Sequence, residues 1–197
     1  NKFAYAPDLG IDQVKFYGFD ANGKLTDKGG FKLIPGSGPR HMKFGKDGSH
    51  AYVLNELTLT VTGFSRDTNG GILTMKNTVS VFPSNTKIAN MSCSEIRVSE
   101  DGKFIYTANR DLTEEGRDSL TVLSVAQDGS LKHLETTPAA VWIPRNINLS
   151  PSGDWLLVAG QKSNEVTSHR IDKKTGRISF SGKSAEVPKA MCINFAR

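Results

Sequence analysis

The sequence lacks several features that would assign a protein to a class at once. It contains no run of about 18 or more apolar residues, the length that crosses a bilayer as a helix, so an integral membrane protein is excluded. Only two cysteines occur, Cys93 and Cys192, with no CxxC pair and no histidines at zinc-ligand spacing. Neither a disulfide framework nor a structural metal is indicated, and we expect two buried free thiols.

Clustered basic charge is also absent, although the chain of 197 residues carries a net charge of +5. Its 25 lysines and arginines are scattered, and the longest basic run is the pair Lys173-Lys174. A nucleic-acid interface needs a basic stripe, so we expect no nucleic-acid partner. No basic and then apolar leader opens the sequence, and residues 1–5 already have the pattern of a strand. We therefore expect the true N-terminus to lie outside this chain.

What the sequence does contain is an internal repeat. Tyr5, Tyr52, Tyr106 and Leu157 occupy equivalent places, at spacings of 47, 54 and 51 residues. Each unit holds short apolar or alternating runs, separated by Asp-Gly, Asn-Gly or Thr-Gly pairs that favour tight hairpin turns. No unit has helical periodicity, which argues against ankyrin and tetratricopeptide arrays. We count four strands in a complete unit.

Four antiparallel strands in a repeat of this length are typical of a β-propeller blade. We therefore predict an all-β fold in which residues 1–197 form one partial propeller domain. The expected blades cover residues 1–35, 36–90, 91–140 and 141–187, and residues 188–197 begin a further strand. Polar segments at 83–92 and 111–118 are expected as insertions between strands, the second as a solvated loop.

The expected blades do not make a complete ring. The first unit lacks its opening strand, so we expect an open arc of about four blades from a larger propeller, with a closed four-bladed ring as the alternative. Exposed blade faces and edges are an aggregation hazard. A missing propeller segment or a neighbouring chain would therefore cover the ends.

Equivalent positions in a propeller lie at equivalent heights, which places polar residues of different repeats around one mouth of the central channel. The ends of the second strands contribute Glu56, Arg110 and Gln161. The starts of the first strands contribute two rows, Arg40 with Ser94 and Arg145, then His41 with Glu95 and Asn146. Charged groups at inner positions are costly to bury unless they are paired or used, which makes them site candidates.

Arginines and a glutamate at one mouth suit a small anionic lactone, because the guanidinium fork binds a carboxylate or phosphate bidentately. Glu56 can act as a base, while Arg40 or Arg110 stabilises charge that grows on the carbonyl oxygen. We predict no metal and no cofactor. The remaining polar candidates are expected to bind substrate, namely Arg145, His41, Gln161 and Asn109.

Several motifs that recur in order resemble the seven-bladed propeller lactonase family, which includes bacterial 6-phosphogluconolactonase and fungal carboxymuconate lactonizing enzyme. They are Gly-Ser-Gly-Pro-Arg-His at 36–41, Tyr-Val-Leu-Asn-Glu-Leu at 52–57, Tyr-Thr-Ala-Asn-Arg at 106–110 and Cys-Ile-Asn-Phe at 192–195. The resemblance implies a seven-bladed ring and a catalytic set of one histidine, two arginines and one glutamate. Arg40, Arg110 and Glu56 occupy the matching motifs. The family's histidine lies upstream of residues 8–10, outside this chain, and His41 is not its equivalent.

Three functions remain open at this point. The first is a lactone hydrolase of the 6-phosphogluconolactonase type, and the second is a cycloisomerase that acts on a carboxymuconate by proton transfer without water. The third is a propeller that binds partners without chemistry. Arg40, Glu56 and Arg110 would then form a structural ion-pair network between blades, and His41 would be a structural residue of an inner strand.

Overall fold

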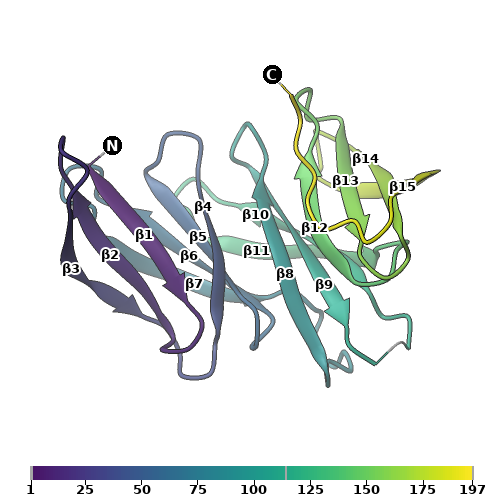
Figure 1. Cartoon of the computed structure of the whole chain (residues 1–197), viewed down its shortest axis with the longest axis horizontal. Coiled ribbons are helices and arrows are strands. Elements are labelled where there is room, and N and C mark those ends of the chain that lie inside the picture. Colours follow the sequence, from purple (N-terminus) through teal and green to yellow (C-terminus); the bar gives the residue numbers. More distant parts are fainter. Residues whose placement is uncertain (1, 114, 197) are drawn as a thin grey trace.

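All regular structure in the chain is β-strand in the computed structural model, which describes residues 2–113 and 115–196. The strands form four antiparallel sheets, each built from strands that are consecutive in the chain (Figure 1). The described residues contain no helix, and so none that is long and apolar enough to cross a membrane. The predicted all-β fold of propeller blades is confirmed.

Each sheet corresponds to one sequence repeat. The first contains β1 (Phe3–Asp8), β2 (Gln13–Phe19) and β3 (Leu25–Lys32). The second contains β4 (Pro39–Phe44), β5 (His50–Asn55), β6 (Thr60–Arg66) and β7 (Leu73–Ser80). The third contains β8 (Met91–Val98), β9 (Phe104–Asp111), β10 (Ser119–Val125) and β11 (Leu131–Pro138). The fourth contains β12 (Pro144–Leu149), β13 (Trp155–Gly160), β14 (Glu165–Ile171) and β15 (Ile178–Glu186).

The structure confirms the alignment of the repeats. Tyr5, Tyr52, Tyr106 and Leu157 are each the third residue of their strand, in β1, β5, β9 and β13. In the three complete sheets this strand pairs with an inner strand, and in the first sheet β1 itself is the edge. Equivalent residues of different sheets therefore lie at equivalent heights along the channel. The prediction that the site residues share one mouth depends on this.

The hydrophobic core lies between neighbouring sheets rather than within one sheet. Three buried clusters each combine residues of two consecutive units, and they include Val14 with Phe64, Leu54 with Ile105, and Leu120 with Leu156. Fully burying one such side chain contributes about 1.5–3 kcal/mol. A sheet alone exposes these faces to water, so each sheet depends on its neighbour for stability.

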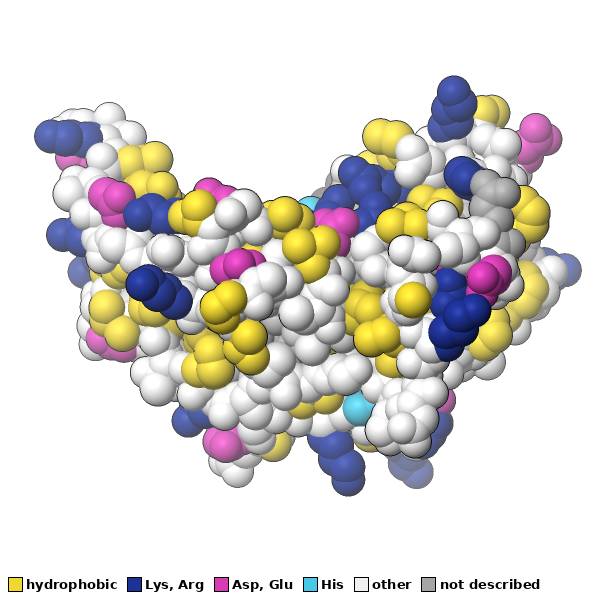
Figure 2. Space-filling model, turned by 90° about the horizontal axis from the view of Figure 1, so that it is seen from below, with side chains coloured by type: hydrophobic (Ala, Val, Ile, Leu, Met, Phe, Trp, Pro, Cys, Tyr) yellow, Lys and Arg dark blue, Asp and Glu magenta, His cyan; other side chains and the backbone are white. Residues whose placement is uncertain are grey.

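The sheets follow one another in an arc, with the first and the last at opposite ends (Figure 1). β4 contacts β8, β8 contacts β12, and β1 contacts β4, so these strands line the inner side. Figure 2 shows the hollow that the arc encloses, with basic, acidic and histidine side chains at its floor.

Residues 188–196, expected to begin a further strand, form no strand in the structure. They nevertheless run beside β12, where the amide of Ile193 donates to Asn146 Oδ1 (3.0 Å) and Asn148 Nδ2 donates to the Ile193 carbonyl (2.9 Å). An inner strand pairs with the second strand of its own sheet, and the described residues hold no such strand for this segment. Cys192, also expected to be buried, is exposed, whereas Cys93 is buried as expected.

The segment 111–118 is exposed at Leu112, Glu115 and Gly116, as expected of a solvated loop, but both of its ends are buried. Asp111 is 1% exposed and Asp118 is 7% exposed. Arg117 pairs with Asp111 (Nη2–Oδ1, 2.9 Å) and donates to the carbonyls of Lys87 and Ala89 in the other insertion. This pairing satisfies the Asp111 carboxylate, which allows its burial.

Three hairpin glycines fix the approach of each sheet to the preceding one. Gly71, Gly129 and Gly176 have positive φ angles of 75°, 84° and 74°. A Cβ atom added to these glycines would come within 2.7 Å of Phe16, 2.1 Å of His50 and 2.2 Å of Phe104, respectively. Each contact is with the preceding unit, so glycine is needed both for the turn and for the packing between sheets.

Replacing one of these glycines should therefore lower the free energy of unfolding by more than the strain in the turn alone would. Gly176→Ala should lower the free energy of unfolding by about 3 kcal/mol, because the new methyl group meets the packed Phe104 ring at a left-handed backbone position. Gly182→Ala is the matched control, since Gly182 has a φ of 72° and an added Cβ there meets nothing within 4 Å. The control should cost about 1 kcal/mol. Urea unfolding of the intact protein measures both, and equal losses would contradict the packing role.

Candidate active site

The central feature of the channel mouth is Glu56, which lies between two arginines. Glu56 directly follows β5, Arg40 lies at the start of β4, and Arg110 lies near the end of β9. The Arg40 Nε atom is 3.0 Å from Glu56 Oε2, and Arg110 Nη2 bonds to Glu56 Oε1. Arg110 Nη2 also donates to the Cys93 carbonyl (3.1 Å). The carboxylate thus joins the second sheet to the third.

A repeated β-bulge presents the first row of candidates. The pairing of β4 with β5 shifts at Arg40, that of β8 with β9 shifts at Ser94, and that of β12 with β13 shifts at Arg145. In each case the bulged residue has no partner in the ladder. A bulge bends its strand and redirects its side chain, and such bulges are frequent next to active sites. The bulge explains why Arg40 reaches the neighbouring sheet, where it donates to the Ser94 carbonyl.

Positive charge exceeds negative charge in this cluster. The side chains of Arg40, Glu56 and Arg110 are 17%, 18% and 10% exposed, so their charges are only partly screened by water. Burial lowers the pKa of Arg40 below its ordinary value, Glu56 opposes this, and the charges of Arg145 and Arg110 lower it further. Glu56 and, more weakly, Glu95 therefore oppose the mutual repulsion of the three guanidinium groups.

Two of these arginines keep donors available. Arg145 is half-buried and makes no hydrogen bond or ion pair to any residue of 2–113 or 115–196. The Nε atom of Arg110 is buried and likewise has no hydrogen-bond partner among them. A buried donor without an acceptor costs about 1–3 kcal/mol, so a buried polar group of this kind is normally matched by water or a ligand.

A second charged group lies one row further along the inner strands. Glu95 in β8 is 4% exposed. Its Oε1 atom is 2.8 Å from His41 Nδ1 and 2.6 Å from Arg97 Nη1, and its Oε2 atom accepts a hydrogen bond from Asn146 Nδ2 (2.6 Å). Glu95 therefore connects three sheets through β4, β8 and β12.

A contact between Arg40 and His41 links the carboxylate of Glu56 to that of Glu95. Arg40 Nη1 is 2.7 Å from His41 Nε2, so the histidine contacts both Glu95 and the arginine that pairs with Glu56. An open cavity of about 260 Å³ lies beside this contact and is lined by Tyr5 of β1 together with Arg40 and His41. His41 thus borders the same hollow as the charged cluster.

The structure brings four of the seven predicted site residues into one cluster, namely Arg40, Glu56, Arg110 and Arg145, and it places His41 beside them. Gln161 makes no hydrogen bond to these residues, and its Nε2 atom is 3.5 Å from Met191 Sδ. Asn109 has no exposed surface, and its amide donates to Ser119 and Thr121 within the sheet. Asn109 therefore lies in the interior of the blade.

Two further charged residues of the inner strands, Arg97 in β8 and Lys43 in β4, were not among the site residues predicted from the sequence. Arg97 donates to Asn148 Oδ1 (3.1 Å) in addition to pairing with Glu95, and Lys43 occupies the equivalent place in β4. The repeat alignment holds the signal, because these residues lie two places after the row of His41.

The arrangement is able to bind an anion next to a carboxylate. Arginines 40, 110 and 145 provide fixed positive charge and several N–H donors, which suit the oxygens of a carboxylate, a phosphate or an oxyanion. Glu56 provides a proton acceptor at the same mouth.

Radial four-stranded antiparallel sheets around a charged channel define a β-propeller with a site at its axis. The chain matches the family described as "Lactonase, 7-bladed beta-propeller" over residues 1–195. The chain belongs to this family.

Several relatives of the chain are named 6-phosphogluconolactonase, among them proteins of Bacillus subtilis and Formosa agariphila. The one from Bacillus subtilis is 31% identical over 196 residues, which are 99% of this chain and 54% of that protein. The one from Formosa agariphila is 32% identical over 199 residues, which are 98% of this chain and 53% of that protein. The chain therefore spans about half the length of the curated relatives it matches.

A solved structure agrees with these relatives. The periplasmic gluconolactonase PpgL of Pseudomonas aeruginosa is 29% identical and superposes with a TM-score of 0.90, covering 100% of this chain and 54% of that one.

The charge contacts of Glu95 should make stability depend on pH. Burial raises the pKa of Glu95, but the hydrogen bond from His41 and the charges of Arg97 and His41 outweigh it and lower the pKa from 4.5 to about 2. Because the folded state holds this proton less tightly, Glu95 contributes about 3 kcal/mol of stability above pH ~4.5. This contribution is lost as the pH falls towards about 2.

Urea unfolding of the intact protein between about pH 2 and pH 7 checks this dependence. Glu95→Gln should be less stable than the wild type at neutral pH and should have a flatter profile below about pH 4.5. Glu115→Gln is the control, since Glu115 is 49% exposed and pairs only at the surface with Lys87 and Arg117. Parallel profiles for the wild type and Glu95→Gln would exclude Glu95 as the source.

Proposed function

We propose that the complete protein is a lactone hydrolase of the 6-phosphogluconolactonase type that acts on an anionic sugar lactone. The observation that carries the proposal is the position of Glu56 between Arg40 and Arg110 at the channel mouth. Membership of the lactonase family and the names of the relatives support the same reaction.

The arginines bind and polarise the substrate in this proposal. Arg145, which has no ion-pair partner among the described residues, takes the phosphate or carboxylate of the lactone. The guanidinium groups of Arg110 and Arg40 lie at the channel mouth, where they can stabilise negative charge on the lactone carbonyl oxygen. Pre-positioned donors of this kind lower the barrier to acyl transfer, because they need no rearrangement during the reaction.

Glu56 activates the attacking water. The water oxygen forms a bond to the carbonyl carbon while Glu56 accepts a proton, and the bond between the carbonyl carbon and the ring oxygen then breaks. The ring oxygen leaves as a hydroxyl group by taking the proton that Glu56 accepted from the water, which restores the Glu56 carboxylate, and the product is the open hydroxy acid.

Substrate binding frees the base. Each Glu56 oxygen is paired with an arginine in the structure, Oε2 with Arg40 and Oε1 with Arg110. An anionic lactone competes for the same guanidinium groups. We infer that this competition releases one oxygen of Glu56, so that the base becomes available only when substrate is present.

The ends of the arc also need a cover. The first sheet exposes Phe19 (48%) and Leu25 (54%), and the fourth exposes Phe180 (49%). We propose that further blades of the complete ring, or a neighbouring chain, pack against these faces, as the interior sheets pack on one another.

Replacing the base should remove turnover and spare binding. In the intact protein, Glu56→Gln should lower kcat for 6-phosphogluconolactone by about 10²–10⁴ and change KM little, because the amide keeps the shape but cannot accept the proton. Glu135→Gln is the matched control, since Glu135 is also paired with an arginine, Arg177, but on the outer strand β11. It should retain full activity.

The outcome also separates the three functions. Full turnover in Glu56→Gln would contradict the role as base, and a wild-type protein that turns over carboxymuconate but not the phosphorylated lactone would favour the cycloisomerase. A folded protein that is inactive on both substrates would favour the structural ion-pair network.

Arg145 should set the preference for anionic substrates. Arg145→Lys should raise KM for 6-phosphogluconolactone about tenfold, because an ammonium group cannot reproduce the bidentate contact of the guanidinium group. KM for the uncharged glucono-δ-lactone should not change. If both lactones lose affinity equally, Arg145 acts on the shape of the mouth and not on the anion.

A further inference from the structure

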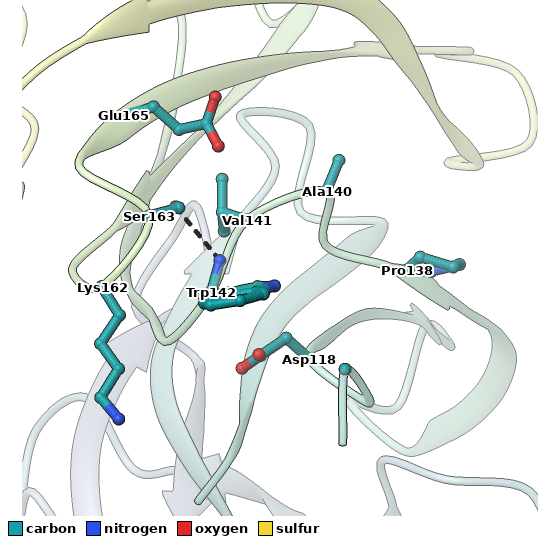
Figure 3. Close-up of a pocket in the computed structure, with 9 residues that line it drawn as sticks. Asp118, Pro138, Ala140, Val141, Trp142, Lys162, Ser163 and Glu165 are labelled. Carbon is teal, nitrogen blue, oxygen red and sulfur yellow. Dashed lines mark hydrogen bonds between the residues drawn. The ribbon is translucent and has the colours of Figure 1, made fainter. Parts of the chain in front are cut away.

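A second cavity lies between the third and fourth sheets. Its volume is about 520 Å³. It is lined by residues at the start of β10, the link from β11 to β12, and the turn from β13 to β14, including Asp118, Trp142, Ser163 and Glu165 (Figure 3). Both of the sheets that form it are complete, so its walls do not depend on missing blades.

Trp142 presents an exposed aromatic ring to this cavity. The residue is 58% exposed, although an exposed tryptophan is unusual in a folded protein. Figure 3 shows the indole between Asp118 on one side and Glu165 on the other. The indole N–H has no hydrogen-bond partner among the described residues.

The backbone around Trp142 is held in a strained conformation. Ala140 and Ile143 have positive φ angles of 54° and 53°, and such an angle is a marked outlier for the β-branched Ile143. The Trp142 amide donates to Ser163 Oγ (3.1 Å), and the Trp142 carbonyl accepts from the amide of Lys162 (3.1 Å). The surrounding contacts thus fix the outward position of the ring. Strain of this kind persists where the surroundings over-determine the conformation, and it clusters at functional sites.

Asp118 supplies an acceptor that lines the cavity. Its Oδ1 atom accepts hydrogen bonds from the amides of Asp111 (3.0 Å) and Ile143 (3.2 Å). Its Oδ2 atom has no partner among the described residues, although Asp118 is only 7% exposed. Burial raises the pKa of Asp118. A carboxylate oxygen without a partner in such a place is an unused acceptor for a ligand.

The charge of the cavity selects against anions. Glu165 is half-buried on the opposite wall, and no described residue bonds to its carboxylate. Lys162 also lines the cavity but already has an interaction of its own. Two carboxylates disfavour the phosphorylated or acidic molecules that the arginine cluster suits. A quaternary ammonium ligand is also less suited, because such ligands are held by a cage of several aromatic rings and Trp142 is the only ring in this lining.

We propose that this cavity binds an uncharged pyranose sugar, whose C–H face stacks on the side of Trp142 that is turned towards Asp118 and one of whose hydroxyl groups donates to Asp118 Oδ2. An apolar surface with a polar acceptor beside it is the general pattern of a small-ligand site. A hydroxyl that reaches Asp118 Oδ2 satisfies an acceptor that the fold leaves open. The proposal does not depend on the lactonase reaction, because no residue of the arginine cluster lines this cavity.

Titration calorimetry of the intact protein with D-glucose tests the proposal. We expect binding with a Kd of about 1–10 mM. Trp142→Ala should abolish this binding and leave lactonase activity unchanged. Trp155→Phe is the matched control, because Trp155 packs under Arg170 (5.4 Å from the guanidinium carbon to the ring centroid) and does not line the cavity; it should bind glucose normally.

Asp118→Asn provides an independent test with little risk to the fold. The asparagine oxygen can still accept from the amides of Asp111 and Ile143, while the NH2 group replaces the acceptor that faces the ligand. Glucose affinity should fall about tenfold or more, whereas any binding of glucose 6-phosphate should be the same in the wild type and Trp142→Ala.

Several results would overturn the assignment. They are the absence of glucose binding up to about 100 mM, glucose binding that Trp142→Ala and Asp118→Asn leave unchanged, and binding of choline in place of glucose.

Discussion

Each sheet of this protein is stable only against its neighbours, because its hydrophobic faces are buried between sheets. The three mixed clusters bring consecutive units together, and the hairpin glycines set how closely they approach. This packing turns a linear repeat into an arc with the inner strands side by side. The charged residues at the channel mouth come from strands that are far apart in sequence, and they meet only because the sheets are held in this way.

Polar contacts between sheets follow from the same geometry. Glu56 of the second unit reaches Arg110 of the third, and Glu95 of the third reaches His41 of the second and Asn146 of the fourth. A buried carboxylate with a single partner adds little net stability, because desolvation offsets the attraction. Here each carboxylate has several donors, so the two residues orient the arginines and the histidine of the site while they join the sheets.

The sequence alone predicts the repeat, the blade boundaries and the arginine–glutamate cluster, since these depend on period, turn pairs and equivalent positions. Tyr52 and Tyr106 are aligned correctly because local strand and turn signals recur around them. The bulge at Arg40 and Arg145 was not predictable, because it appears only in the pairing of two strands. The buried ends of the 111–118 segment were missed for a related reason, as they depend on Arg117 reaching the other insertion.

The bulge affects how a site of this type can evolve. Its residue is Arg40, Ser94 or Arg145 in successive sheets, and the strands pair in the same way in all three. The residue at this place is thus free of the constraints that register imposes on its neighbours. Charge around the mouth can be exchanged one blade at a time without refolding the scaffold, which lets a single propeller frame accommodate new substrates through successive point substitutions.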